Sequence, residues 1–168
     1  TVTSTRGHLT DNYNPTNKTI NLSESVYASN SIAAAAVAAH ETGHAIQDAY
    51  GYAPLRVRSA LVPVISFASQ WSFLLIIVGI ILINTMPAIF WAGIALIALS
   101  AIFSVITLPV EYNASNRAMQ WLEASGTLHG EALQQAGTAL RWAARTYLVA
   151  ALSAIATLLY YIGFARRD

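Results

Sequence analysis

Apolar and polar positions are unevenly spread along the chain, and the longest apolar stretch carries no charge. Between Arg58 and Glu111, 52 consecutive residues include no Asp, Glu, Lys, Arg or His. A helix needs about 20 apolar residues to cross a bilayer, so this stretch is long enough for two crossings. We predict membrane-spanning helices over about 62–83 and 88–108, and a third over the apolar run at about 147–164. A set of helices buried in a large soluble core is the alternative, and uncharged runs of this length argue against it.

Prolines and turn residues suggest where the two central spans begin and end. Residues 84–87, Asn-Thr-Met-Pro, form the polar, turn-like break between them. Pro63 falls near the start of the first span, where a missing N–H is tolerated, and we expect Pro109 to end the second.

The polar stretch before the spans predicts a hairpin followed by helices. Residues 8–22 contain turn chemistry, Asn-Pro-Thr-Asn-Lys, between two short extended arms. Ser23 and Glu24 open a short helical turn. A long Ala-rich helix follows over about 31–49, with Ser31 as its cap and Gly51 as its stop.

A second polar stretch follows the central spans. Residues 111–124 are expected to be helical, with a break at Gly126 and a further helix from about 130 that continues into the third span. The fold class is therefore mainly α, a multi-span membrane protein with a small N-terminal β-hairpin. Four segments are predicted: residues 1–58 with the hairpin and Ala-rich helix, 59–110 as a transmembrane hairpin, 111–146 as a second polar helical segment, and 147–168 as the third span.

The amino-acid composition excludes several classes of protein and of active site. Only 10% of the 168 residues are charged, against about 25% in soluble domains. The net charge of +1 offers no basic field for nucleic acid, so no nucleic-acid partner is expected. The absence of cysteine excludes a disulfide scaffold, a cysteine nucleophile and a Cys-ligated metal.

The Ala-rich helix carries the motif HExxH as His40-Glu41-Thr42-Gly43-His44. Spacing of i, i+4 places both imidazoles on one helix face, where they can share one metal ion. Zinc suits neutral imidazole ligands and keeps one position for water. Glu41 is the natural general base, because it follows the first ligand without having to bind the metal.

A hydrolytic zinc site needs a third protein ligand, and acids are few. Asp48 is on the same helix, too far along it to close the site, whereas Glu123 and Glu131 lie among polar, solvated residues. Glu111 is the first charged residue after the 52 uncharged ones. Two predicted crossings separate it from His44 and return the chain to the membrane face that it left, so Glu111 is a candidate third ligand. Glu111 can also be read as an ordinary acid near a helix N-terminus.

Five sequence blocks in order resemble the YugP-type neutral zinc metallopeptidases of bacterial membranes. The resemblance covers nearly the whole chain and implies a membrane-embedded metalloprotease with His40, His44 and Glu111 as zinc ligands and Glu41 as base. A more distant similarity links Glu-Tyr-Asn-Ala-Ser to the Glu-Tyr-Xaa-Ala-Asp element of HtpX-type heat-shock proteases and CAAX prenyl proteases. The blocks are residues 7–15, 40–47, 52–63, 108–118 and 146–154.

The chain departs from these patterns at several positions. Ser115 stands where the distant relatives have Asp, so a supporting carboxylate is not carried over. Asn12 and Asn14 replace His and Asp in the hairpin, which removes support for a metal or substrate role there. The resemblance also implies a further membrane helix before residue 1, so the chain is expected to be a shortened product.

In the expected mechanism, zinc-activated water attacks a peptide carbonyl while Glu41 takes its proton and passes it to the leaving amine. Supporting or oxyanion candidates are Tyr112, Ser115, Arg117 and His129, with His8 also available; for each, a structural role is the alternative. Residues Thr19, Ile20 and Asn21 are a candidate edge strand for an extended substrate.

The function expected from the sequence is a zinc endopeptidase acting on proteins or peptides near the membrane surface, in membrane-protein quality control. A metal-binding, non-proteolytic scaffold in a larger membrane complex is the alternative, and the intact Glu41 argues against it. Expected partners are a protein substrate, the lipid bilayer and a candidate larger complex. The expected location is the bacterial inner membrane with a cytoplasmic active site, because arginines at 56, 58, 141 and 145 outnumber those at 166 and 167.

Overall fold

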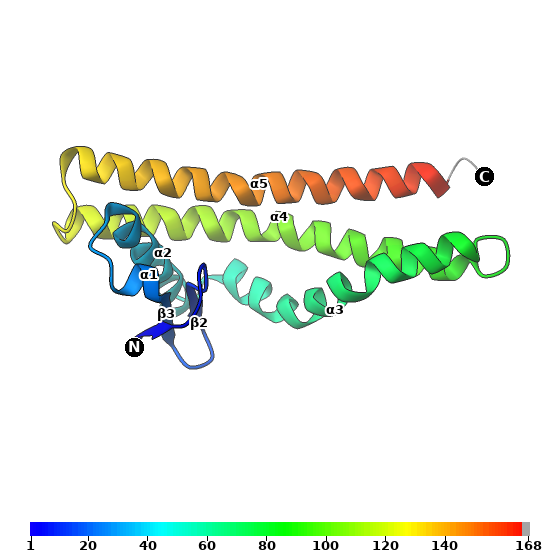
Figure 1. The fold of residues 1–168 in the computed structure, drawn as a ribbon, viewed down its shortest axis with the longest axis horizontal. Helices are drawn as coiled ribbons and strands as arrows, with labels where there is room; N and C mark the ends of the chain where they lie inside the picture. Colours follow the sequence, from blue (N-terminus) through cyan, green and yellow to red (C-terminus); the bar gives the residue numbers. More distant parts are fainter. Residues whose placement is uncertain (166–168) are drawn as a thin grey trace. The chain divides into compact units, whose positions relative to one another are not determined.

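A computed structural model describes residues 1–165 and contains three short strands and five helices (Figure 1). The mainly helical fold class predicted from the sequence is confirmed. In chain order the elements are β1 (Val2–Thr5), β2 (Asn12–Asn14), β3 (Thr19–Ser23), α1 (Glu24–Tyr27), α2 (Ile32–Ala49), α3 (Ala53–Ile81), α4 (Pro87–Ala124) and α5 (Gly130–Ala165).

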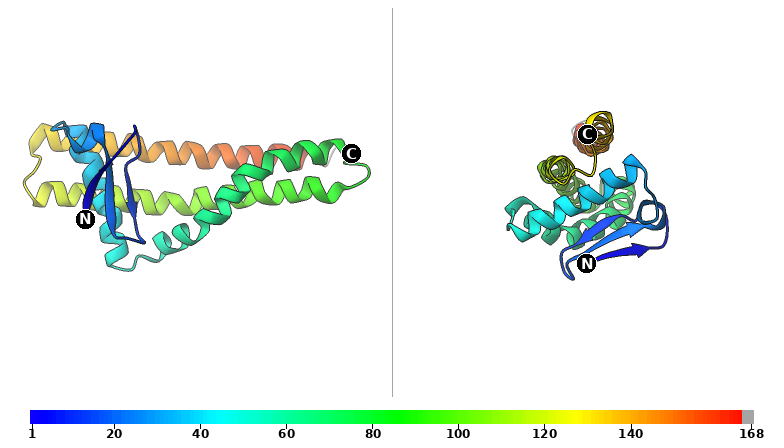
Figure 2. Two further views of the ribbon diagram at one scale, coloured as in Figure 1. Left: turned by 60° about the horizontal axis from the view of Figure 1, so that its bottom comes forward. Right: turned by 90° about the vertical axis from the view of Figure 1, so that its left-hand side faces the viewer.

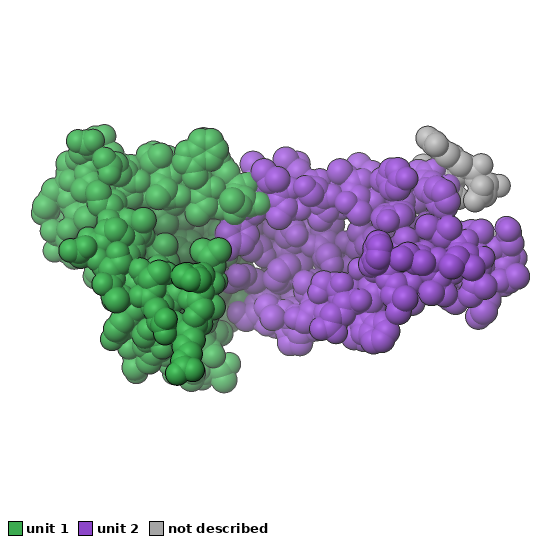
Figure 3. Space-filling model, viewed as in Figure 1, with its two compact units in different colours: residues 1–56, 109–146 green, residues 57–108, 147–168 purple. Residues whose placement is uncertain are grey.

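The chain divides into two compact units, coloured separately in Figure 3. Unit 1 comprises residues 1–56 and 109–146, and unit 2 comprises residues 57–108 and the chain from 147 onward. Unit 1 therefore holds the sheet, α1, α2 and the polar parts of α4 and α5. Unit 2 holds most of α3 and the apolar parts of α4 and α5.

The sheet of unit 1 has the strand order β1-β3-β2. The predicted hairpin is formed by β2 and β3, which pair antiparallel, whereas β1 was not predicted and pairs with β3 in parallel. A single apolar residue in Val-Thr-Ser-Thr gives almost no strand signal, so this pairing depends on the neighbouring strand. The prediction that Thr19, Ile20 and Asn21 form an edge strand is wrong, because β3 is the central strand and is paired on both sides.

Helix α2 is the centre of unit 1 and follows its sequence signals. The Ser31 hydroxyl accepts a hydrogen bond from the Ala34 N–H at 3.2 Å, and Gly51 adopts φ +66° just after the helix. The sheet lies against one side of α2 and α4 passes on the other (Figure 2). A core of small and apolar side chains joins α2 to α4 and α5: Ala36, Ala39, Ala118, Leu122, Ala136 and Leu140.

Two helix boundaries predicted at prolines are wrong. Helix α3 begins at Ala53, so Pro63 is inside it and not at its start. Helix α4 continues through Pro109 to Ala124 instead of ending there. An internal proline costs a helix about 3 kcal/mol through its missing N–H and a clash with the preceding turn. In α4, burial on the far side of Pro109 offsets this cost, because Val110, Ala114, Ala118 and Leu122 are fully buried.

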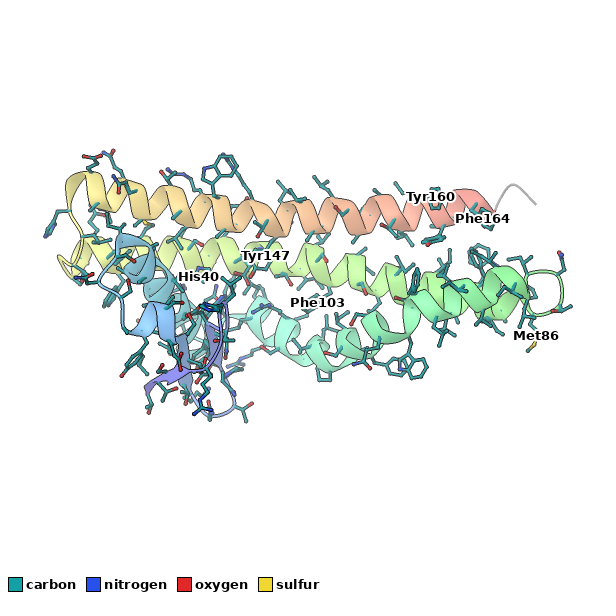
Figure 4. All side chains as sticks on the ribbon, in the orientation of Figure 1. His40, Met86, Phe103, Tyr147, Tyr160 and Phe164 are labelled. Atoms are coloured by element: carbon teal, nitrogen blue, oxygen red, sulfur yellow. The ribbon has the colours of Figure 1, made fainter. Side chains whose placement is uncertain are left out.

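Unit 2 contains apolar segments of three helices, and α3, α4 and α5 are each long and apolar enough to cross a membrane. Ile76 of α3 and Phe90 and Ile94 of α4 form its buried cluster, with Leu158 and Tyr161 of α5 packed against them. The turn between α3 and α4 carries the exposed Met86 (Figure 4). The predicted cytoplasmic orientation depends in part on Arg166 and Arg167, which lie outside the described residues.

Candidate metal centre

Helix α2 places the imidazoles of His40 and His44 one turn apart on one face, the arrangement that their i, i+4 spacing predicts. Their ring centroids are 4.8 Å apart and the ring planes are nearly perpendicular, at 84°. His44 is buried and His40, labelled in Figure 4, is partly exposed. The pair therefore presents two nitrogen donors from a buried helix face.

Helix α4 brings Glu111 to this pair. Its Oε2 lies 3.1 Å from His40 Nε2 and 3.6 Å from His44 Nε2. The approach of α4 depends on Gly43, because a Cβ at that position would stand 2.4 Å from the carbonyl oxygen of Ala114. A residue with no side chain thus allows the backbone of α4 to lie directly against α2.

The donor atoms of His40, His44 and Glu111 all lie within 4.8 Å of one another. Two imidazoles and a carboxylate are a donor set that Zn²⁺ accepts, and three protein ligands are the number that catalytic zinc sites use. Glu111 is 1% exposed, and a buried carboxylate is stable only when charges or donors face it. The residues present therefore fit a divalent metal ion.

The other acids weighed as third ligand have different surroundings. Asp48 accepts hydrogen bonds from Tyr13 and Lys18 of the hairpin. Glu131 accepts one from Gln135, and Glu123 is exposed. Among the described residues, the cluster that could hold a metal consists of His40, His44 and Glu111.

Each histidine contacts a polar side chain through the ring nitrogen that faces away from Glu111. His40 Nδ1 is 3.2 Å from the Ser115 hydroxyl, and His44 Nδ1 is 3.0 Å from Gln47 Oε1. Both Nε2 atoms are therefore left facing the carboxylate, and such partners fix how metal-binding imidazoles point. Ser115 was among the supporting candidates, whereas Gln47 was missed. The sequence does contain a signal for Gln47, because its i+3 spacing from His44 places an amide on the same face of an apolar helix as that histidine.

Burial and charge shift the proton affinities at this site. Burial raises the pKa of Glu41 above its ordinary value, against the opposing effect of His44 and His40. Burial favours the neutral form of His44, but the adjoining Glu111 carboxylate outweighs it and the pKa of His44 is raised. Glu41 is only 8% exposed, so a carboxylate lies in a mostly water-excluded position next to the donor cluster.

The remaining candidates are more dispersed. Tyr112 follows Glu111 on α4 and is 42% exposed. Arg117 donates from Nε to Asn113 Oδ1 at 2.8 Å and lies over the ring of Tyr50. His129 is exposed in the loop between α4 and α5, and His8 is exposed in the loop between β1 and β2. Neither of these two histidines belongs to the donor cluster.

Comparison with known proteins shows what the whole chain is similar to. The sequence pattern of a family described as "Putative neutral zinc metallopeptidase" matches residues 1–166. The "Putative membrane protease YugP" of Bacillus subtilis (strain 168) is 40% identical over 157 residues, which are 94% of this chain and 69% of that protein. No solved structure matches the chain significantly.

Proposed function

The chain belongs to the neutral zinc metallopeptidase family, and from that premise we propose that it is a membrane-embedded endopeptidase. His40, His44 and Glu111 hold a zinc ion, and Glu41 is the general base. The observation that carries this proposal is the convergence of the three donor side chains, from two helices, within 4.8 Å. Glu41 lies in the same helix turn as the two histidines.

The bound ion and its three ligands would have distinct parts in the reaction. When bound, zinc supplies a Lewis acid that polarises a carbonyl oxygen and makes water more acidic. His40 and His44 would hold the ion through Nε2, the nitrogens that face Glu111, and Glu111 would hold it through its carboxylate. Burial of the cluster keeps bulk water away, which strengthens every electrostatic interaction there.

Glu41 is positioned to move the proton. Because it follows His40 directly, its carboxylate belongs to the ligand turn of α2 without being one of the three donors. It takes a proton from the attacking water and gives it to the nitrogen of the leaving amine, so that the C–N bond breaks and the products separate as a carboxylic acid and an amine. Tyr112 and Arg117 remain candidates for stabilising the developing oxyanion. Ser115, which contacts His40, is better suited to holding that ring.

The position of Glu111 along α4 suggests a substrate class. The helix continues without a break from the apolar residues 88–108 to Glu111, and a rise of 1.5 Å per residue places Glu111 about 5 Å beyond Leu108 along the axis. If 88–108 span the bilayer, the site lies close to the membrane surface. Peptide segments near that surface are then the substrates, which fits a role in membrane-protein quality control. The excess of arginine at 56, 58, 141 and 145 favours a cytoplasmic site.

The experiment that tests this function is hydrolysis of an unfolded, fluorescently labelled protein by the detergent-purified chain. The wild type is expected to cleave it. Glu41→Gln, which keeps the shape but removes the base, and a chelated sample are expected to lose at least about 100-fold in rate. Glu123→Gln makes the same substitution at an exposed position of α4 and is expected to retain wild-type activity.

Activity that survives Glu41→Gln would sink the proposed mechanism. A wild-type chain that binds zinc and cleaves nothing would favour the metal-binding scaffold instead.

A further inference from the structure

Gln47 is a fully buried amide at the C-terminal end of α2, and the proposed reaction assigns it no part. Its Oε1 lies 3.0 Å from His44 Nδ1. Its Nε2 donates to the carbonyl oxygen of Val110 at 2.8 Å and to Asn113 Oδ1 at 3.0 Å. One side chain thus links a ligand on α2 to the turn of α4 that carries Glu111.

The orientation of this amide is set by two groups that each have a single hydrogen-bonding role. The Val110 carbonyl can only accept, so the Gln47 atom that faces it must be the nitrogen. The Arg117 Nε–H can only donate, so the Asn113 atom that faces it must be the oxygen. That same oxygen faces Gln47 and again requires the amide nitrogen there. A flip of the amide would lose both bonds at once.

The fixed amide in turn fixes the tautomer of His44. Because Gln47 Oε1 can only accept, Nδ1 of a neutral His44 ring must carry the proton. The lone pair is then on Nε2, the atom that lies 3.6 Å from Glu111 Oε2. A neutral His44 ring therefore presents a metal-binding nitrogen toward the cluster before any ion arrives.

His40 is not constrained in this way through its Nδ1 contact. Its Nδ1 faces the Ser115 hydroxyl at 3.2 Å, and a hydroxyl can donate or accept. Ser115 is compatible with either tautomer of His40. The chain of contacts from Val110 and Arg117 through Gln47 selects the tautomer of His44 alone.

We propose that Gln47 is a positioning residue that holds His44 in its metal-binding tautomer and orientation, and that Asn113 with Arg117 holds Gln47. The proposal rests on the ligand assignment of the proposed function. It differs from that function in what it requires, since it concerns the affinity for zinc and not the cleavage of a peptide.

The test measures Zn²⁺ affinity of the detergent-purified chain by competition with a chelator, without any substrate. Gln47→Met keeps the length of the side chain and removes all three contacts. Loss of such a partner typically weakens metal affinity about 10–100-fold, and we expect a loss in this range. Gln135→Met is the matched control, because Gln135 is exposed on α5 and donates to Glu131 in the same helix. Zinc affinity of Gln47→Met within about threefold of wild type would overturn the proposal.

A second pair of variants separates positioning from damage to the fold. Asn113→Asp keeps an acceptor for both Gln47 and Arg117, whereas Asn113→Leu removes it. We expect the aspartate variant to keep nearly wild-type affinity and the leucine variant to lose it, although neither changes a metal ligand. Because Asn113 acts through Gln47, Asn113→Leu should add little to the loss caused by Gln47→Met. Full additivity of the two losses, or equal affinity of the two Asn113 variants, would contradict the proposed network.

The absorption spectrum of the Co²⁺-loaded chain gives a readout that general destabilisation does not move. We expect the visible bands to change in Gln47→Met and to stay unchanged in Gln135→Met. A wild type that binds zinc but cleaves no protein would end the proposed function and leave this inference standing. A Gln47→Met variant with normal affinity and spectrum would end the inference even if the wild type is a peptidase.

Discussion

Gly43 lies between the two histidines of α2, and the absence of a side chain there sets how near α4 can come. A Cβ at this position would stand 2.4 Å from the Ala114 carbonyl oxygen and 3.1 Å from its Cα. These are backbone atoms, so they cannot move aside as a flexible side chain does. The contact of Glu111 with both imidazoles therefore depends on the absence of a Cβ at position 43.

We expect Gly43→Ala to lower stability and zinc affinity together. Overpacking of a buried contact typically costs about 1–3 kcal/mol, and the forced separation of α2 and α4 moves Glu111 away from the histidines. Thermal unfolding and chelator competition on the purified chain measure the two effects. Gly163→Ala is the control, since an added Cβ there meets no atom of the described residues within 4 Å. Unchanged affinity in Gly43→Ala would show that the close approach is not needed to form the site.

The shared helix face of His40 and His44 is predictable from the sequence, because their i, i+4 spacing on one helix carries that geometry, whereas the role of Glu41 as base stays a prediction. Glu111 could only be proposed, since it is 67 residues from His44 and its place depends on how the chain returns. Gln47 could not be assigned a role from sequence. Its partners on α4, Val110 and Asn113, become neighbours only once α2 and α4 cross.

At the scale of elements, Asp48 in the C-terminal half of α2 forms hydrogen bonds with the hairpin of β2 and β3. Its Oδ2 accepts from the Tyr13 hydroxyl at 2.6 Å and from the Lys18 ammonium. The bond from Lys18, with that from Tyr13, holds the pKa of Asp48 below its ordinary value. Burial, together with the hydrogen bond to Asp48, raises the pKa of Tyr13 to about 12.

Stability should therefore depend on pH in a way that Asp48→Asn removes. A carboxylate whose pKa is lowered on folding contributes stability above its unfolded pKa, and this contribution is lost as the pH falls through the folded value. We expect the metal-free wild type to unfold at a higher temperature than Asp48→Asn at pH 6, and the difference to shrink as the pH falls below about 3.8, the ordinary pKa of the group, toward its lowered value in the folded protein. A difference that stays constant down to pH 3 would show that Asp48 does not act through its charge.

Element types are predictable from this sequence, whereas some element boundaries are not. The cap at Ser31 and the stops at Gly51 and Gly126 are local signals, and the structure follows them. Pro63 and Pro109 are also local signals, but both helices continue through them, and at Pro109 the burial of the residues that follow offsets the cost. Strand β1 is the opposite case, because it has almost no signal of its own and forms by pairing with β3.

At the scale of the whole molecule, the charge pattern agrees with the division into units. The 52 uncharged residues nearly coincide with residues 57–108 of unit 2, and all three metal-binding candidates belong to unit 1. Helix α4 belongs to both units, so its apolar part and the ligand Glu111 are on one continuous element.

The absence of cysteine allows the membrane placement to be tested directly. Met86→Cys and Ser125→Cys place single thiols at exposed positions beyond the two ends of α4. Because α4 is expected to span the bilayer with its site-bearing end in the cytoplasm, a membrane-impermeant maleimide should label Met86→Cys in intact cells. It should label Ser125→Cys only after the membrane is opened. Labelling of both thiols from the same side would exclude a single crossing by α4.

The measurement that tests the central claim most directly is the zinc content of the purified chain by mass spectrometry, compared between wild type, His44→Ala and Glu111→Ala. We predict one zinc per wild-type chain and a loss of most of that zinc in each variant, because each removes one of three protein ligands. Glu123→Ala, at an exposed position on the same helix as Glu111, should retain its zinc. If His44→Ala and Glu111→Ala both keep stoichiometric zinc, the metal centre assigned to His40, His44 and Glu111 is wrong.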